Sequence, residues 1–375
     1  MGIVVGDAKE LNVNSKSVCQ FYEQYWKRKI ALSNHSFYEW QFTGSPSDAG
    51  DDHCMLAMDD SSNQLVGVMG LNTRPFYIDG SIVNGAELTT WMVDEKHFGK
   101  GVGAKILKKI QGKYDVLIGM GITDAALSVY MRSGFRYIRT IPRYVKVFDF
   151  DSVAAHAKHD MLAKKLAKQW SVLGNDVPFE SKIADSESIE LLQPLIGKQL
   201  NFFSRDYKFL EWRYVNHPVF DYQQYVIHSK GGKGKGVYVA LREETSIENL
   251  KILHVMDFIG DQSDMPAAIS FIHDYCTKNK VHLADFYCTA TTISRHFISS
   301  GWFSINDDLC FQFPHLFHPM ELRIPPTTSL IYWSRDDFLE MSDISRLYIT
   351  KQDSDLDRPT MDTYEKLSYV EQGGV

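Results

Sequence analysis

Residues 98–104, Phe-Gly-Lys-Gly-Val-Gly-Ala, place three glycines and a lysine between a strand-like run (82–93) and a strongly helical segment (102–111). At such a junction the free N–H groups of the first helical turn point outward, glycines let a ligand approach the chain, and the helix dipole favours negative charge. The segment therefore predicts an anion site, and a nucleotide or pyrophosphate is the ligand that best fits it. A glycine-rich turn that binds nothing has the same sequence, so the loop needs support from other residues.

Two common nucleotide-binding motifs are disfavoured by their spacing. Gly99, Gly101 and Ala104 fit the G-x-G-x-x-A pattern of dinucleotide-binding folds. However, no acidic residue ends a following strand about 20 residues later, where such folds contact the ribose. The Walker pattern G-x-x-x-x-G-K-[ST] does not occur in the chain. We therefore do not expect the loop to bind phosphate as part of a dinucleotide-binding or a Walker motif.

Residues 91–107 resemble the acyl-CoA loop of the GNAT superfamily of N-acetyltransferases, whose pattern is Arg/Gln-x-x-Gly-x-Gly/Ala at a strand-to-helix junction. Gly101 and Gly103 match this pattern, and Lys100 stands where a second basic residue is common. Phe98 replaces the usual Arg or Gln. This departure removes one side-chain contact from a site that is built mostly of backbone N–H groups.

Residues 128–139 resemble the other recurring segment of this family, a helix carrying a tyrosine followed by Gly-Phe and a strand. Tyr130, Gly134 and Phe135 sit at the matching positions, and Thr123 stands where Asn is frequent. The two segments occur in the order and at the approximate separation that the family requires. The resemblance covers roughly residues 10–148.

The resemblance implies that acetyl-CoA, or another acyl-CoA, is a co-substrate of this chain. Its diphosphate would bind the glycine-rich loop, and its pantetheine arm and thioester oxygen would bind the preceding strand by backbone hydrogen bonds. The residues expected to hold it are Met92, Val93, Phe98, Gly99, Lys100, Gly101, Val102, Gly103 and Ala104.

The same resemblance assigns two catalytic residues. An amine that attacks a thioester directly must lose a proton, and the leaving thiolate must gain one. Glu87, on the strand that leads to the loop, is the candidate general base, and Tyr130 is the candidate general acid or donor to the sulfur. The alternative for Glu87 is a structural carboxylate that hydrogen-bonds to a neighbouring strand. The alternative for Tyr130 is a buried tyrosine whose hydroxyl is already hydrogen-bonded. The base could instead come from the second half, as His254 or Asp257.

Aromatic and charged residues gather at expected loops of the C-terminal half. The clusters at 212–218 and 353–359 resemble segments of two-domain GNAT-like proteins encoded with bacterial surface-polysaccharide (O-antigen) genes. There the acceptor is often a nucleotide-linked amino sugar. Aromatic rings would stack on such a ligand, Arg and Lys would pair with its diphosphate, and carboxylates would bind its hydroxyls or amine. The candidate substrate-binding residues are Arg213, His217, His254, Asp257, Asp355 and Arg358.

No metal site is expected. The 13 histidines are scattered without ligand spacing, and the 5 cysteines include no C-x-x-C pair. Residues 353–357 resemble the start of a calcium loop. However, Arg358 stands where that loop needs glycine, and Tyr364 stands where it needs a closing glutamate.

The composition describes a folded protein without a nucleic-acid or membrane signature. The chain carries 40 Lys and Arg against 47 Asp and Glu, a net charge of −7, which argues against a dedicated nucleic-acid binder. Hydrophobic residues make up 44%, enough for a sizeable core. No apolar run approaches the length of about 18 residues that a membrane span needs, and the first residues lack a signal-peptide pattern. Sparse cysteines fit a reducing cytosol, so we expect a cytoplasmic protein, and its oligomeric state stays open.

Elements that could position these residues occur twice along the chain. The first half predicts a helix (14–30) and a strand hairpin, and then strand, helix, strand, and a helix that ends at Gly134. The second half repeats strand, helix, strand, and a helix that ends at Gly301, with Phe297 in place of the tyrosine and no glycine loop. The predicted ranges are 53–58, 64–71, 82–93, 102–111, 116–120, 124–133 and 135–141, then 251–259, 265–279, 283–288, 292–300 and 302–305.

At about 150 residues per domain, 375 residues fit two domains. We expect an α/β fold of two GNAT-like domains, each a mixed, largely antiparallel twisted sheet flanked by helices. Residues 1–150 would bind acyl-CoA, and residues 151–180 would form a helical linker. An exposed helix is expected at 149–169, across the start of this linker. Residues 181–375 would be a degenerate copy that shapes the acceptor site, with a β-hairpin at 222–228 and 237–242.

The leading hypothesis is therefore an N-acyltransferase that acts on the amine of a small acceptor, most simply a nucleotide-linked amino sugar. One alternative is acyl transfer to a peptide or protein amine. A second, motivated by Phe98, is a non-catalytic protein that binds acyl-CoA or a nucleotide sugar.

Overall fold

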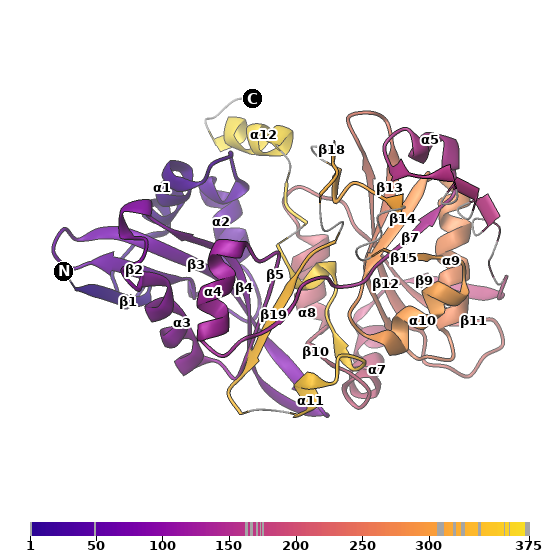
Figure 1. The fold of residues 1–375 in the computed structure, drawn as a ribbon. Coiled ribbons are helices and arrows are strands. Elements are labelled where there is room, and N and C mark those ends of the chain that lie inside the picture. Colours follow the sequence, from indigo (N-terminus) through magenta and orange to yellow (C-terminus); the bar gives the residue numbers. More distant parts are fainter. Residues whose placement is uncertain are drawn as a thin grey trace.

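Two mixed β-sheets, each flanked by helices, lie side by side in the computed structural model of the chain (Figure 1). The arrangement confirms the predicted α/β fold with mixed, twisted sheets, and 375 residues fit two domains. The structure describes residues 2–48, 50–161, 164–165, 168–169, 172, 174, 176–305, 311–317, 320–323, 327–336, 339–355, 357–359 and 361–371.

The first sheet runs in the order β1-β2-β3-β4-β5-β19-β6. Most neighbours are antiparallel, but β4 and β5 are parallel and are connected through α3 (Val102–Lys113). A short pair of parallel strands, β10 and β20, joins the sheet at the far end of β3. The strands are β1 (Ile3–Asp7), β2 (Met55–Asp59), β3 (Gln64–Ile78), β4 (Ser81–Val93), β5 (Val116–Met120), β6 (Arg136–Ile138), β10 (Asn201–Phe203), β19 (Leu330–Ser334) and β20 (Leu347–Tyr348).

Helices cover both faces of the first sheet. Successive strand side chains point to opposite faces. Accordingly, Leu56 packs with α1 (Ser15–Tyr25) and α2 (His35–Phe42), whereas Ala57 packs with α3. On the α3 face, α4 (Asp124–Arg132) begins at Thr123, whose side chain accepts a hydrogen bond from a first-turn amide.

The second sheet runs in the order β15-β7-β14-β13-β12-β11-β9. Its one parallel pair among the described strands, β13 and β14, is connected through α9 (Met265–Lys278). Side chains of α7 (Ser186–Gly197), α9 and α10 (Thr291–Ser299) share one core with the central strands. The strands are β7 (Arg143–Val147), β9 (Phe179–Ile183), β11 (Gln223–Ser229), β12 (Val237–Thr245), β13 (Lys251–Gly260), β14 (Leu283–Tyr287) and β15 (Phe303–Ile305).

Short elements complete the described chain. A π-helical turn (Glu211–Val215) follows α8 (Tyr207–Leu210), and a 3-10 turn (Lys351–Asp353) follows β20. Two further 3-10 turns are Ala31–Ser33 and Glu95–His97. The remaining elements are α5 (Phe150–Ala154), β8 (Lys158–His159), β16 (Phe311–Gln312), β17 (Leu316–Phe317), β18 (Met320–Glu321), α11 (Leu339–Ser342) and α12 (Met361–Glu371). In this described part of the chain no helix is long and apolar enough to cross a membrane.

Each sheet contains a strand from the other half of the chain. Strand β19 lies between β5 and β6 in the first sheet, although about two hundred residues separate it from them, and β7 joins the second sheet beside β14. The two halves are therefore tied together by backbone hydrogen bonds in both directions.

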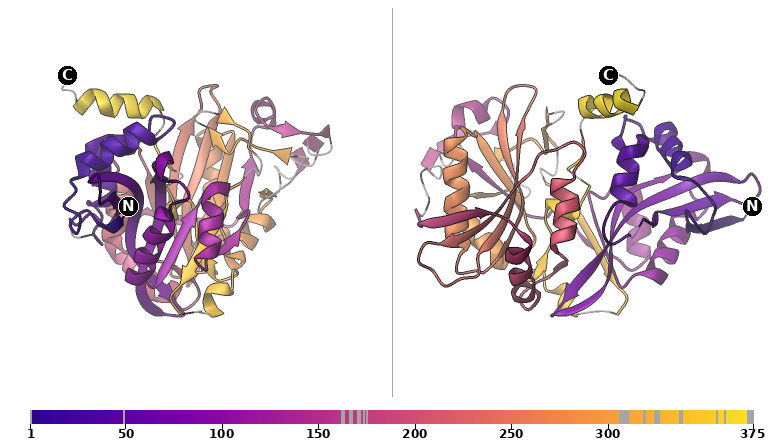
Figure 2. Two further views of the ribbon diagram at one scale, coloured as in Figure 1. Left: turned by 60° about the vertical axis from the view of Figure 1, so that its left-hand side comes forward. Right: turned by 180° about the vertical axis from the view of Figure 1, so that it is seen from behind.

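The segment after β20 passes between the two sheets, as the yellow trace in the middle of Figures 1 and 2 shows. Its Asp353 is fully buried and pairs with Arg74 of β3 at 2.8 Å and with Arg205 at 2.7 Å. Arg205 in turn pairs with Asp257 of β13 at 2.8 Å. This buried ion network anchors the segment that begins at Asp353 between the halves, and α12 then lies above α1 (Figure 1).

Most predicted elements are present, including β5 and α4, the latter ending just before Gly134 with φ +83°. The predicted hairpin forms from β11 and β12. One continuous helix over 149–169 was wrong, because α5 ends at Ala154 and β8 then pairs with β16. The helix predicted for 14–30 ends at Tyr25, and the strand predicted for 135–141 is shortened to β6.

Candidate active site

A cleft opens where the parallel strands β4 and β5 separate. Their pairing runs from Gly85 with Val116 to Leu88 with Gly119 and stops there. Beyond this point a pocket of about 440 Å³ lies between the two strands, with walls from β4, from the turn after β5 and from the second half of the chain. Its walls near the split are Leu88, Thr89, Thr90, Trp91, Met120, Gly121, Ile122 and Thr123.

The glycine-rich loop stands beside this cleft. Gly99 and Gly101 have φ of +74° and +78°, the left-handed region that favours glycine, and open space surrounds both. Gly101 is the N-cap of α3 and supplies no side-chain hydrogen bond, so the first-turn amides of Val102, Gly103 and Ala104 are left for an external acceptor. The loop therefore has the geometry of an anion site.

Gly103 connects the loop to the cleft wall. A Cβ on Gly103 would lie 2.4 Å from Cζ2 of Trp91, a residue that lines the cleft. Glycine is thus needed here so that the Trp91 ring can pack against the start of α3.

The remaining loop residues lie at the surface or along β4. Phe98 is 63% exposed and Lys100 is also exposed. Met92 and Val93 pair with β3 on one side only, because β5 has ended before it reaches them. The outer edge of β4 at these residues therefore offers backbone groups to a ligand.

Tyr130 of α4 lines the cleft and is 2% exposed. Its ring makes edge contacts with Trp91 at 5.1 Å and with Phe135 at 5.0 Å. Burial raises the pKa of the Tyr130 hydroxyl well above its ordinary value, so this hydroxyl stays protonated at neutral pH and can donate.

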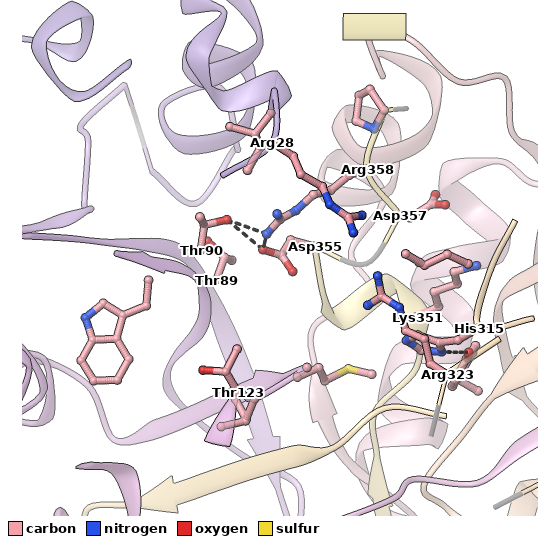
Figure 3. A pocket seen from close by; sticks show the side chains of 18 of the residues that line it. Arg28, Thr89, Thr90, Thr123, His315, Arg323, Lys351, Asp355, Asp357 and Arg358 are labelled. Atoms are coloured by element: carbon pink, nitrogen blue, oxygen red, sulfur yellow. Dashed lines mark hydrogen bonds and ion pairs between the residues drawn. The ribbon is translucent and has the colours of Figure 1, made fainter. Parts of the chain in front are cut away.

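The cleft wall opposite Thr89 and Thr90 carries the basic side chains of Lys351 and Arg323 and also His315, which is neutral because burial lowers its pKa to about 3 (Figure 3). His254 also lines the cleft but is buried, with Nδ1 at 2.6 Å from Asp285 and Nε2 at 3.1 Å from Glu244. Lys351 Nζ lies 3.1 Å from His254 Nδ1. Both ring nitrogens of His254 are thus occupied by protein groups, which suits a positioning role better than proton transfer.

Asp355 and Arg358 form the border of the cleft at Thr90 (Figure 3). Arg358 pairs with Asp355 and donates to Thr90 Oγ1 at 2.5 Å, and this hydroxyl donates to Asp355 Oδ2 at 3.1 Å. Burial lowers the pKa of Arg358 to about 10. Both charged residues also line a second, smaller pocket on the other side of this border.

The second pocket has a volume of about 30 Å³ and lies next to Glu87. Five of the sequence-predicted site residues line it, although they come from three distant segments of the chain: Glu87, Arg213, His217, Asp355 and Arg358.

Glu87 is 4% exposed, and its two carboxylate oxygens have different surroundings. Asn72 Nδ2 donates to Oε2 at 3.1 Å, whereas Oε1 has no hydrogen-bond partner among the described residues. Burial raises the pKa of the Glu87 carboxyl above its ordinary value, and the charge of Arg74 and the Asn72 hydrogen bond oppose this rise. A buried carboxylate with one open oxygen and a raised pKa is suited to accept a proton.

Arg213 and His217 belong to the region around the π-helical turn. The Arg213 guanidinium lies 3.4 Å from the Tyr222 hydroxyl, which itself bonds to Asp357. His217 Nδ1 accepts hydrogen bonds from the N–H groups of Val219 and Phe220, and burial lowers its pKa to about 3. His217 is therefore neutral and carries its proton on Nε2.

Asp257 does not join the other predicted residues. It is fully buried, and its carboxylate accepts from Arg205 at 2.8 Å and from Tyr348 at 2.5 Å. It belongs to the ion network that holds the C-terminal segment, and it lines neither of the two pockets.

Sequence reasoning missed several residues of the two pockets. Thr90, Lys351, Arg28 and Arg323 line the cleft, and Trp40 lines the smaller pocket. None of them belongs to a local motif, and only the fold brings their segments together. In the described ranges no group of three or more His, Cys, Asp or Glu could hold a metal ion.

Residues 16–135 match the model of the acetyltransferase (GNAT) family, and this stretch contains β2 to β5, the glycine loop, Glu87 and Tyr130. No curated protein matches the chain. Among solved structures, the GCN5-related N-acetyltransferase from Anabaena variabilis superposes with a TM-score of 0.56 at 11% identity, covering 89% of this chain and 73% of that one. A probable N-acyltransferase from Enterococcus faecalis superposes with a TM-score of 0.56 at 10% identity, covering 90% and 73%. Residues 16–135 thus match a GNAT-family domain, and the fold of the chain is similar to the folds of these two proteins.

Proposed function

We propose that this protein is an acyl-CoA-dependent N-acyltransferase that transfers an acetyl or short acyl group to the amine of a small acceptor. The observation that carries the proposal is the split between β4 and β5, which opens a cleft lined by Trp91 and Tyr130, and the Trp91 ring packs against the glycine-rich start of α3. The family match over residues 16–135 supports the same assignment.

The co-substrate would bind through backbone groups. The first-turn amides after Gly101 suit its diphosphate, because they are unpaired donors at the positive end of a helix. The unpaired outer edge of β4 at Met92 and Val93 suits the amide groups of its pantetheine arm. Such a site tolerates Phe98 in place of a basic residue, since most donors come from the main chain.

The transfer itself removes two protons from the nitrogen and adds one to the sulfur. The acceptor ammonium gives its first proton to Glu87, directly or through water, and becomes a neutral nucleophile. Its nitrogen bonds to the thioester carbon as the carbon–sulfur bond breaks, and the departing thiolate takes a proton from Tyr130. The nitrogen, which still carries one extra proton, returns it to the Tyr130 oxygen, and solvent removes the proton on Glu87. The raised pKa of each group matches its role: the Glu87 carboxylate holds a proton more firmly than an ordinary glutamate does, and the Tyr130 hydroxyl stays protonated until the thiolate departs.

For the acceptor, we propose a nucleotide-linked amino sugar. The second half of the chain would shape its site, because Lys351 and Arg323 face the cleft from the side opposite the split strands, and Arg28 of the first half adds a third basic side chain to the cleft lining. Clustered Lys and Arg side chains suit a diphosphate. The Asp355–Arg358 pair would then lie between this charged end and the reacting amine.

The proposal is tested by thiol release from acetyl-CoA in the presence of UDP- and dTDP-linked amino sugars, free amino sugars and lysine peptides. Release of CoA with a nucleotide-linked amino sugar, together with an acetylated product of the expected mass, supports it. Turnover with peptides alone would leave the N-acyltransferase activity standing and overturn the acceptor. Tight CoA binding without turnover of any amine would favour a non-catalytic binding protein.

A further inference from the structure

The small pocket beside Glu87 has a wall of aromatic rings. Trp40 stacks on Trp212 with ring centroids 5.0 Å apart, and His217 meets the edge of Trp40 at 4.5 Å. Phe37 and Phe209 close the wall at 5.3 Å from Trp40 and Trp212, respectively. Aromatic faces attract a cation that lies close to them, most strongly at tryptophan.

Four polar atoms of the residues that line this pocket have no hydrogen-bond partner in the part of the chain that the structure describes. Two are acceptors, Glu87 Oε1 and Asn72 Oδ1. Two are donors, Trp40 Nε1 and Gln352 Nε2. Glu87 and Gln352 are 4% and 2% exposed, so leaving their polar atoms unpaired is costly unless a ligand or solvent pairs them.

The other charged side chains of the pocket already have partners. Asp355 pairs with Arg358, and Asp357 pairs with Arg242 at 2.5 Å. Arg213 bonds to the Tyr222 hydroxyl and lies 5.6 Å from the Tyr214 ring. The charges of Arg74 and Arg213 act on the Glu87 carboxylate from a distance, but its Oε1 has no hydrogen-bond donor among the described residues, so a ligand that donates hydrogen bonds, such as an ammonium, would satisfy it next to the aromatic wall.

We propose that this pocket recognises a vicinal amino alcohol, that is, an ammonium group together with the hydroxyl on the neighbouring carbon. Glu87 Oε1 and Asn72 Oδ1 accept from the ammonium, which lies against the Trp40–Trp212 pair. Trp40 Nε1 and Gln352 Nε2 donate to the hydroxyl oxygen. Each of the four unpaired atoms then has a partner of the right kind.

The size of the pocket agrees with this ligand. A cavity needs about 10–15 Å³ for one water-sized group, so about 30 Å³ admits two small polar groups and little more. The rest of the acceptor must therefore extend past Asp355 and Arg358 into the larger cleft. The inference rests on the proposed function and sharpens it: the acceptor amine is flanked by a hydroxyl, and Trp40, Asn72 and Gln352 determine specificity.

The test uses the full-length protein labelled with 5-fluorotryptophan and titrated with 2-aminoethanol, ethylamine and ethylene glycol, while ¹⁹F NMR follows the Trp40 and Trp212 signals. These signals are assigned from Trp40→Phe and Trp212→Phe. We expect 2-aminoethanol to bind at least tenfold more tightly than either probe that lacks one of its two groups. Equal affinity for 2-aminoethanol and ethylamine would overturn the proposal.

Two variants locate the binding. Glu87→Gln should remove the preference for 2-aminoethanol over ethylene glycol. Trp40→Phe keeps an aromatic ring but loses the Nε1–H donor, so it should remove the preference for 2-aminoethanol over ethylamine. Trp333→Phe, outside both pockets, should leave all affinities unchanged. Retained 2-aminoethanol binding in both pocket variants would overturn the proposal.

Acetyl-CoA binding, measured on the same samples, separates this inference from the proposed function. Acetyl-CoA binding without any preference for 2-aminoethanol would refute the pocket assignment alone. Selective 2-aminoethanol binding without acetyl-CoA binding would refute the acyltransferase proposal alone.

Discussion

Glu87 on β4 and Asn72 on β3 face each other across the two strands, and Asn72 Nδ2 holds one oxygen of the Glu87 carboxylate at 3.1 Å. The other oxygen has no hydrogen-bond partner among the described residues, and Glu87 lines the small pocket. The carboxylate is therefore oriented by its neighbour and still able to take a proton. This relationship connects the predicted base to the acceptor side of the site.

Glu87→Gln should lower kcat by about 100-fold or more with little change in acetyl-CoA affinity, since the amide keeps the shape and loses the base. In the wild type, kcat/KM should rise with pH, with an apparent pKa above the ordinary glutamate value of 4.5, because burial raises the pKa of Glu87. In the variant this rising limb should disappear. Steady-state kinetics across pH measure both effects. Glu190→Gln, on the exposed surface of α7, is the matched control. An unchanged kcat in Glu87→Gln would rule out its role as base.

Tyr130→Phe should lower kcat by about 10- to 100-fold, because the thiolate then lacks its nearby donor. The loss should be smaller with acyl donors whose leaving thiol is more acidic, since those need less protonation. Thiol-release assays with such donors measure this difference. Tyr137→Phe on β6, which packs on the same core, should retain activity. A Tyr130→Phe enzyme with wild-type kcat would assign the tyrosine to packing alone.

Arg28→Gln combined with Arg323→Gln should raise KM for a nucleotide-linked amino sugar by about tenfold, as loss of hydrogen bonds to a charged group predicts. Both side chains face the cleft and both pair with Glu321 near its rim. The KM for an amino sugar without a nucleotide should not change. Initial rates with the two acceptors give the comparison, and an equal rise for both would show that these arginines act on the fold and not on a diphosphate.

The buried carboxyl group of Asp48 should make the folding stability of the protein depend on pH. It is 1% exposed, accepts from Thr73 at 2.5 Å, and burial raises its pKa from 3.8 to about 7. Between these two values the folded state binds more protons than the unfolded state, so stability should fall as pH rises from about 4 to about 7 and level off above that. Asp48→Asn should remove this slope and stabilise the protein at pH 8 by on the order of 1–2 kcal/mol. Urea unfolding at several pH values measures it, and an unchanged slope in the variant would contradict the assignment.

Elements with local signals were predictable from the sequence. The helix start at Thr123, its end before Gly134 and the glycine turn before α3 each depend on a few adjacent residues. The insertion of β19 between β5 and β6 was not predictable, because apolar alternation marks a strand but does not name a partner about two hundred residues away. The continuous helix at 149–169 failed for the same reason: β8 exchanges helical hydrogen bonds for pairing with a distant strand.

The candidate site also combines residues that the local sequence predicts with residues that only the fold brings together. Glu87 and Tyr130 could be predicted as site residues from motifs at fixed offsets along the chain, and the structure places each of them at one of the two pockets. Trp40 and Gln352 could not, because they come from opposite ends of the sequence and meet Glu87 only when the C-terminal segment passes between the sheets. Asp257 has a side chain that could bind an acceptor, and the sequence therefore suggested a site residue. Its partner Arg205 lies on a separate segment, so nothing in the sequence near Asp257 indicates that it is buried in an ion network.

The measurement that tests the central claim most directly is a calorimetric titration of acetyl-CoA into the wild type, Gly103→Ala and Gly112→Ala. The two glycines lie on the same helix. A Cβ on Gly103 would strike Trp91 at 2.4 Å, whereas a Cβ on Gly112 would meet nothing within 4 Å. We predict that the wild type and Gly112→Ala bind acetyl-CoA with one site, and that Gly103→Ala binds at least tenfold more weakly while remaining folded. Failure of the wild type to bind acetyl-CoA, or equal binding by Gly103→Ala, would contradict an acyl-CoA site at this loop.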